Sequence, residues 1–117
     1  MLIDLTENPD CTECGLCREA CPVFQIQRQE EYSPRGRVML DCAGLQTLVF
    51  YQCTLCRTCR IVCPIGHDPN GETLRSELIN AGIETSANQT MIINIRLYGN
   101  PFGPLADGEL PKVLTCC

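Results

Sequence analysis

Apolar residues recur at three- and four-residue spacing over residues 35–42, and this spacing is typical of an amphipathic helix. Ser33 and Pro34 precede the stretch and predict its N-cap and its first helical position. Gly44 stands where the helix should end. The apolar side of the helix consists of Val38, Met39 and Cys42. We expect this side to belong to the core.

Two more helices are predicted in the C-terminal third of the chain. One spans about 72–81 and should end at Gly82, and the other begins near Ser86 and should end at 99–101. The sides expected to face inward consist of Leu74, Leu78 and Ala81 in the first helix and Met91, Ile92, Ile95 and Tyr98 in the second. The stretch 65–71 before them is dense in turn formers and is predicted to be a loop.

Short helices are also expected within 14–21 and 56–63, because neither stretch alternates as a strand would. The predicted fold class is therefore all-α, and we expect one domain over residues 1–117 with a modest core. Its two halves should pack as a pseudo-repeat, with the C-terminal helical pair covering one side. No apolar run approaches the roughly 18 residues that span a bilayer.

Cysteine content changes this picture from a small helical protein to a metal-binding one. Eight of the 11 cysteines form two runs of identical spacing, each followed by a proline, and the runs are 42 residues apart. The pattern C-x2-C-x2-C-x3-C-P holds [4Fe-4S] clusters in bacterial ferredoxins, where the fourth cysteine of each run ligates the other cluster. We therefore predict two [4Fe-4S] clusters. The predicted ligands are Cys11, Cys14, Cys17 and Cys63 for cluster one, and Cys53, Cys56, Cys59 and Cys21 for cluster two.

Cysteine-rich chains also occur as disulfide scaffolds and as zinc modules. A secreted disulfide scaffold conflicts with the odd count, the x-x spacing and an N-terminal stretch without a signal-peptide pattern, so a reducing, cytoplasmic location is expected. A zinc module would use separated C-x-x-C pairs or histidine partners. The three spare cysteines are Cys42, Cys116 and Cys117. We expect the terminal pair to be unligated.

The charged residues indicate less about function than the cysteines do. The formal net charge of −5 argues against nucleic acid as a partner. The second run contains Arg57 and Arg60, where the first contains Glu13 and Glu19. Positive charge favours a reduced cluster, so one hypothesis gives cluster two the higher potential. The alternative is that both arginines are solvated and screened.

Arg35 and Arg37 flank Gly36 at the start of the helix predicted over 35–42. They offer a docking site for an acidic partner or, as is more common for two such charges, a solvated polar face. His67 is the sole histidine, and a Rieske-like ligand role would need two, so a structural role is expected.

Three segments together with the cysteine runs resemble the C subunit of heterodisulfide reductase over nearly the whole chain. The segments are Tyr32-Ser33-Pro34-Arg35-Gly36-Arg37, Gly71-Glu72-Thr73-Leu74-Arg75 and Gly99-Asn100-Pro101-Phe102-Gly103. The resemblance implies an α-helical ferredoxin that relays electrons in a hetero-oligomer, between a flavin- and iron–sulfur-containing subunit and a CCG-type disulfide-reducing subunit. By this resemblance only the eight cysteines of the runs carry over as ligands.

Related α-helical ferredoxin modules occur in the iron–sulfur subunits of succinate dehydrogenase, fumarate reductase and glycolate oxidase. A relay subunit of a flavin dehydrogenase is therefore the alternative function. A redox sensor is a third candidate, but the chain has no basic element for reading DNA. Nothing in the sequence pairs a nucleophile with a base, so we expect a non-catalytic subunit.

Overall fold

The structure is a computed structural model that describes residues 9–112. Within these residues it contains six α-helices, two 3-10 helices and no strand, so the prediction of an all-α fold is confirmed. The chain divides into two compact units, residues 1–81 and 82–117. Each is described by itself, and the expectation of a single domain over 1–117 stays a prediction. None of the described helices has the length and apolar character needed to cross a membrane.

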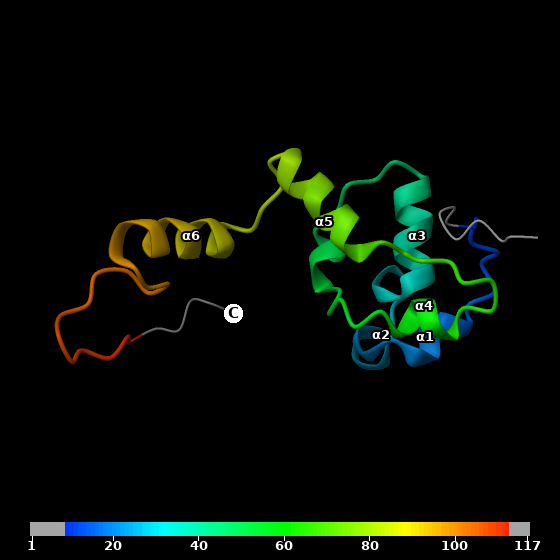
Figure 1. Ribbon diagram of the computed structural model, residues 1–117, viewed down its shortest axis with the longest axis horizontal. Coiled ribbons are helices and arrows are strands. Elements are labelled where there is room, and N and C mark those ends of the chain that lie inside the picture. The colour runs from blue at the N-terminus through cyan, green and yellow to red at the C-terminus, as the bar shows by residue number, and fades with distance from the viewer. Residues whose placement is uncertain (1–8, 113–117) are drawn as a thin grey trace, which may run out of the picture. The chain divides into compact units, whose positions relative to one another are not determined.

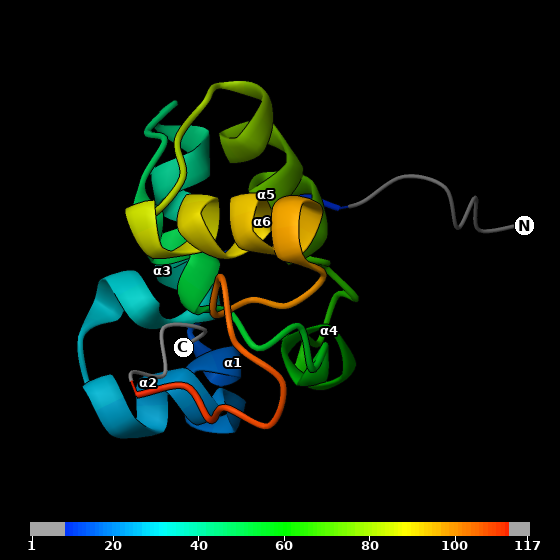
Figure 2. The same cartoon turned by 90° about the vertical axis from the view of Figure 1, so that its left-hand side faces the viewer.

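Unit one carries both cysteine runs. Its elements are α1 (Leu16–Ala20), α2 (Pro22–Gln27), η1 (Glu30–Tyr32), α3 (Pro34–Cys42), η2 (Leu48–Gln52), α4 (Thr58–Val62) and α5 (Gly71–Asn80). Helices α1 and α4 pack against each other (Figure 1), and the view from the side also places them next to each other (Figure 2). Helix α3 packs on η1, and α5 packs on η2. The α1–α4 contact brings the two runs together although they are far apart in the sequence.

The two runs have the same backbone. Glu13 and Leu55 take left-handed φ angles of 59° and 58°, and Gly15 and Arg57 take 81° and 60°. A five-residue helix follows in each run, α1 in the first and α4 in the second. Both helices end one residue before the fourth cysteine. The predicted short helices and their repeat are confirmed.

The two prolines that follow the runs act differently. Pro22 occupies the first position of α2, where its missing N–H is not needed and its fixed φ suits a helix. The helix then buries Phe24, which is 3% exposed. No helix follows Pro64, because the chain turns at Gly66, whose φ is +73°. The identical C-P dipeptides thus open a helix in one half and a turn in the other.

Helix α3 begins as predicted but buries a different side. Ser33 is the N-cap, and its Oγ accepts a hydrogen bond of 2.9 Å from the Gly36 N–H. The buried residues are Pro34, Gly36, Arg37 and Val38. Met39 is 45% exposed and Cys42 is exposed, so the expected apolar side is wrong apart from Val38. The cause is the close approach of α3 to η1, which turns Gly36 rather than Met39 inward.

The core of unit one is small. Its buried apolar side chains are Cys21, Phe24, Val38, Phe50, Leu74 and Leu78. Helix α5 supplies Leu74 and Leu78 as predicted, whereas Ala81 is the exposed C-cap of the helix. A core of this size supplies limited stability, so bound metal would add substantially to the free energy of folding.

Unit two contains α6 (Ser86–Tyr98), which Thr85 caps and Gly99 ends with φ +75°. The predicted bounds are confirmed. The predicted inward side is wrong in part, because α6 has no buried residue and Ile95 and Tyr98 are 47% and 50% exposed. The part of unit two that the structure describes has no second helix to cover that side. The two predicted C-terminal helices therefore exist, but they belong to different units.

Candidate metal centres

A first cavity in unit one is bordered by thiols from both runs. Its cysteines are Cys11, Cys14, Cys17, Cys59 and Cys63. The four thiols predicted for cluster one thus line one cavity, with Cys63 arriving from the second run. Pro34, Arg35 and Val38 of α3 form another part of the wall.

A second cavity is bordered by Cys53 and Cys59, two of the four thiols predicted for cluster two. The remaining two do not line it: Cys56 is exposed on the surface, and Cys21 is buried at 6% exposure. Cys21 nevertheless adjoins this cavity, because its Sγ lies 3.9 Å from Nη2 of Arg37, a lining residue. Cys59 borders both cavities.

Left-handed residues in the runs turn backbone N–H groups toward sulfur. The N–H of Glu13 donates to Cys11 Sγ, and the N–H of Leu55 donates to Cys53 Sγ, both at 3.4 Å. A backbone N–H group directed at sulfur can also stabilise a thiolate that is bound to a metal. Because the same hydrogen bond occurs at the same position of both runs, we expect the first cysteine of each run to have the same role.

The thiols differ in how readily they lose a proton. Burial raises the pKa of Cys59 to about 11 and raises the pKa of Cys17 as well. Hydrogen bonds with Thr58 lower the pKa of the exposed Cys56. Metal binding at these thiols would therefore release protons, chiefly from the buried ones.

The described cysteines, at positions 11–63, are all free thiols. Cys42 is exposed and lines neither cavity, and Cys116 and Cys117 lie outside the described residues. No group of three or more His, Cys, Asp or Glu side chains within residues 9–112 is placed to hold a single metal ion. The thiols instead surround cavities, an arrangement that suits a polynuclear cluster better than one ion.

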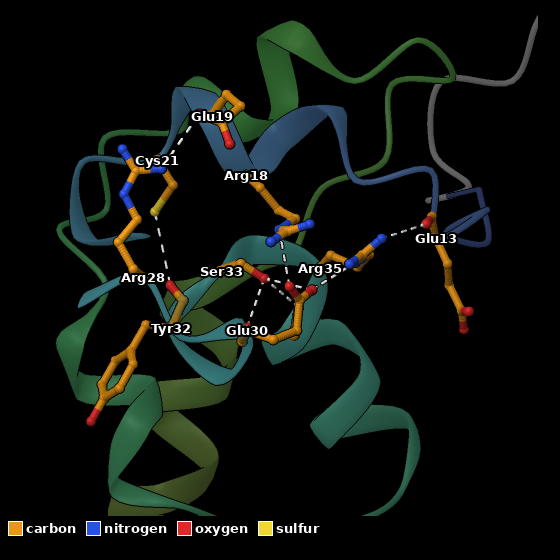
Figure 3. A network of polar contacts seen from close by, with 10 residues as sticks. Glu13, Arg18, Glu19, Cys21, Arg28, Glu30, Tyr32, Ser33 and Arg35 are labelled. Carbon is orange, nitrogen blue, oxygen red and sulfur yellow. Dashed lines mark hydrogen bonds and ion pairs between the residues drawn. The ribbon is translucent and has the colours of Figure 1, made fainter. Parts of the chain in front are cut away.

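A polar network centred on Glu30 fixes the first run against α3 (Figure 3). Glu30 Oε2 lies 2.9 Å from Arg18 Nε of α1, and Glu30 Oε1 lies 2.6 Å from Arg35 Nε of α3. The Arg35 hydrogen bond lowers the pKa of Glu30. Arg35 Nη1 also donates to the carbonyl of Glu13, at 3.0 Å. Arg35 is therefore held by Glu30 and by the Glu13 carbonyl, and the solvated-face interpretation does not apply to it.

The arginines of the second run lie at the surface. Arg57 is 57% exposed and pairs with Glu72 at 2.8 Å. Arg60 is 54% exposed and pairs with Asp68 at 3.4 Å. Their charges are largely screened by water and by these carboxylates. The structure therefore favours the interpretation that Arg57 and Arg60 are solvated rather than the hypothesis that they raise the potential of cluster two.

Two other arginines, Arg37 and Arg75, donate to backbone carbonyls near the cysteine runs, and the sequence did not predict these roles. Arg37 is 3% exposed, and its Nη2 donates to the Tyr32 carbonyl at 2.7 Å, so the solvated-face reading is wrong for it. Arg75 Nη2 donates to the carbonyls of Tyr51, at 2.9 Å, and Cys53. One signal was present for Arg37: it follows the N-cap Ser33 by four residues and so shares its side of the helix.

His67 lines the first cavity, and its Nδ1 lies 2.5 Å from the carbonyl oxygen of Pro9. A carbonyl only accepts, so Nδ1 carries the proton and donates it. This bond ties the segment before the first run to the loop after the second. The geometry agrees with a structural role.

Comparison with known proteins identifies the same region. A family model described as "4Fe-4S dicluster domain" matches residues 7–67. The glycolate oxidase iron-sulfur subunit of Escherichia coli is 36% identical over 64 residues, which are 48% of this chain and 16% of that protein. The probable glycolate oxidase iron-sulfur subunit of Bacillus subtilis is 34% identical over 74 residues, 55% of this chain and 17% of that protein. The match thus spans about a sixth of each relative, and no solved structure matches.

Proposed function

This chain belongs to the 4Fe-4S dicluster domain family, and we propose that it is a non-catalytic electron-transfer subunit of an oxidoreductase complex, with two [4Fe-4S] clusters as its cofactors. A [4Fe-4S] cluster bound by thiolates accepts and gives up single electrons. The observation that carries the proposal is the doubled site: two runs with matching left-handed residues, packed so that thiols of both runs border one cavity.

Cluster one is assigned to Cys11, Cys14, Cys17 and Cys63, which line the first cavity together. Cluster two is assigned to Cys53, Cys56, Cys59 and Cys21. Two of these thiols line the second cavity, and Cys21 adjoins it through Arg37. Thiolates are the usual ligands of such clusters, so the donor set fits the group. The N–H donors to Cys11 and Cys53 would stabilise the bound thiolates.

Each of the two sites has one exposed cysteine, where a partner protein could approach the cluster. Cys14 and Cys56, the second cysteines of the two runs, are both exposed, whereas the remaining six proposed ligands are buried or half-buried. An electron carrier needs at least one surface close to its donor and one close to its acceptor. One exposed thiol in each half supplies two such surfaces and supports a relay within a hetero-oligomer.

The partners are proposed from the two resemblances. The glycolate oxidase iron-sulfur subunits favour a flavin dehydrogenase complex, with a flavin-bearing subunit as electron donor. A heterodisulfide reductase-like complex with a CCG-type subunit is the second candidate. It rests on the resemblance of three sequence segments, two of which, 71–75 and 99–103, lie outside residues 7–67 matched by the family model. Thiolate ligands fit a reducing, cytoplasmic location in either case.

The proposal is tested on protein purified without oxygen. We expect about eight irons and eight sulfides per chain and two one-electron signals in electron paramagnetic resonance. Replacing Cys63 by Ser should weaken the cluster of the first run, because the ligation is crossed. Cys42→Ser is the matched control and should keep both signals. A zinc content that replaces iron would end the proposal, and the subunits that co-purify distinguish the two complexes.

A further inference from the structure

Arg37 is a buried positive charge in unit one. Its side chain is 3% exposed and lines the second cavity beside Cys53 and Cys59. Nη2 donates to the Tyr32 carbonyl at 2.7 Å and lies 3.9 Å from Cys21 Sγ. The Nε group is buried and has no hydrogen-bond partner. The guanidinium is thus held by one neutral carbonyl and one thiol.

No carboxylate pairs with Arg37 in the part of the chain that the structure describes. The ion pairs there involve Arg18, Arg28, Arg35, Arg57 and Arg60. A buried charge without a counter-ion is costly, and native proteins normally pair it. The wall of the second cavity also contains Asp68 and Glu72, but these carboxylates pair with Arg60 and Arg57. The other groups near Arg37 that can become negative are thiols: Cys21 at 3.9 Å, and Cys53 and Cys59, which share the cavity.

We propose that Arg37 is the internal counter-ion of cluster two and gives this cluster the higher reduction potential of the pair. The inference rests on the proposed function, because it requires a cluster held by Cys21, Cys53, Cys56 and Cys59. A cube with four thiolates carries a charge of about −2, and one electron from a reduced flavin of the partner, or from dithionite in a titration, takes it to about −3. A buried guanidinium stabilises the more negative state through a low dielectric.

The first cavity is lined by an arginine of a different kind. Arg35 pairs with Glu30 at 2.6 Å, a carboxylate that it shares with Arg18, and the two arginine side chains are 24% and 36% exposed to water, whereas Arg37 is buried and has no carboxylate partner. In the second run, Arg57 and Arg60 are more than half exposed and pair with Glu72 and Asp68. Arg37 is therefore the charge that distinguishes the two sites, and electrons should rest on cluster two.

The test is a redox titration of anaerobically purified protein, followed by electron paramagnetic resonance. In Arg37→Gln, the higher of the two midpoint potentials should fall by at least about 59 mV, a tenfold change in the ratio of reduced to oxidised cluster. The lower potential should stay. Arg37→Lys keeps the charge and should retain most of the difference. Arg60→Gln makes the same substitution at an exposed residue that lines neither cavity and should move neither potential.

Other results with the Arg37 variants also support or overturn the inference. Unchanged potentials in Arg37→Gln, or a fall in the lower one, overturn the inference while the clusters themselves stand. If Arg37→Gln loses iron and Arg37→Lys keeps both iron and potentials, the positive charge is required to hold cluster two, which supports Arg37 as its counter-ion. Equal loss of iron in both variants makes Arg37 a packing residue and overturns it. If the wild-type protein contains far fewer than about eight irons, the proposed function itself is contradicted, rather than the role of Arg37 alone.

Discussion

Gly15 and Arg35 are in direct contact: a Cβ atom on Gly15 would stand 2.8 Å from Nη1 of Arg35. The guanidinium cannot easily withdraw, because Glu30 and the Glu13 carbonyl hold it. Arg57 takes the corresponding left-handed position in the second run. The glycine of the first run is therefore required by the approach of Arg35 as well as by its φ of +81°.

Gly15→Ala should destabilise the holoprotein by roughly 1–3 kcal/mol, from left-handed strain and from displacement of Arg35. The measurement is the thermal midpoint under anaerobic conditions, with the iron content before and after heating. Gly44→Ala is the matched control, because Gly44 has φ +71° and no atom near the added Cβ. Equal losses in the two variants would show that the Arg35 contact contributes nothing.

Gly36→Ala should be the most damaging glycine substitution. A Cβ at Gly36 would lie 1.8 Å from the backbone carbonyl oxygen of Glu30, so α3 and η1 would have to separate. We expect a loss of about 3 kcal/mol or failure to retain iron, since overpacking against backbone has no cheap relief. Iron content and circular dichroism of the purified variant measure this. A variant with wild-type iron and thermal midpoint would contradict the close packing of α3.

Ser33→Ala should lower stability by about 1–2 kcal/mol, because the fully buried hydroxyl both caps α3 and donates to Glu30. It should also speed the loss of cluster one, since the Glu30 network supports the first run. Thr85→Ala removes the N-cap of α6 and is the control. It should reduce helix stability without changing the rate of cluster loss, measured by the decay of visible absorbance under a chelator.

Glu30→Gln should make the protein less sensitive to acid. The hydrogen bond from Arg35 lowers the pKa of Glu30, so the carboxylate contributes stability above its unfolded pKa, about 4.3, and this contribution is lost as pH falls through the folded value. At pH 7 the variant should be less stable by about 1 kcal/mol, an amount limited by the partial exposure of the ion pairs. The difference should stay constant from pH 7 to about pH 4.3 and shrink below this pH, as Glu30 becomes protonated in the folded protein. Cluster-loss half-lives of the two proteins from pH 7 to below about pH 4.3 test it, and a difference that stays constant over the whole range would exclude the linkage.

Removal of iron should unfold much of unit one. Six buried apolar side chains form its core, and clusters would cross-link runs 42 residues apart. We expect a chelator with reductant to lower the helical circular dichroism signal and to raise amide exchange in α1 and α4. Iron and sulfide added back should restore both. Retention of the full signal in iron-free protein would show that side-chain packing suffices.

The sequence by itself determined the local features. The cysteine spacing predicted the repeated runs, Ser33-Pro34 predicted the start of α3, and Gly44, Gly82 and Gly99 marked helix ends, because caps, prolines and glycines act within one helical turn. The spacing also predicted which cysteines belong together, because in ferredoxins with this pattern the fourth cysteine of each run ligates the other cluster.

Only the tertiary structure decided which charges are buried and which side of each helix faces inward. Arg37 reads in sequence like any helical arginine, yet the approach of α3 to η1 buries it, turns Met39 outward and places Arg37 3.9 Å from Cys21 Sγ. Arg57 and Arg60 read as cluster-tuning charges until their carboxylate partners, Glu72 and Asp68, become visible. Burial and ion pairing depend on residues far away in the sequence, so no local pattern contains them.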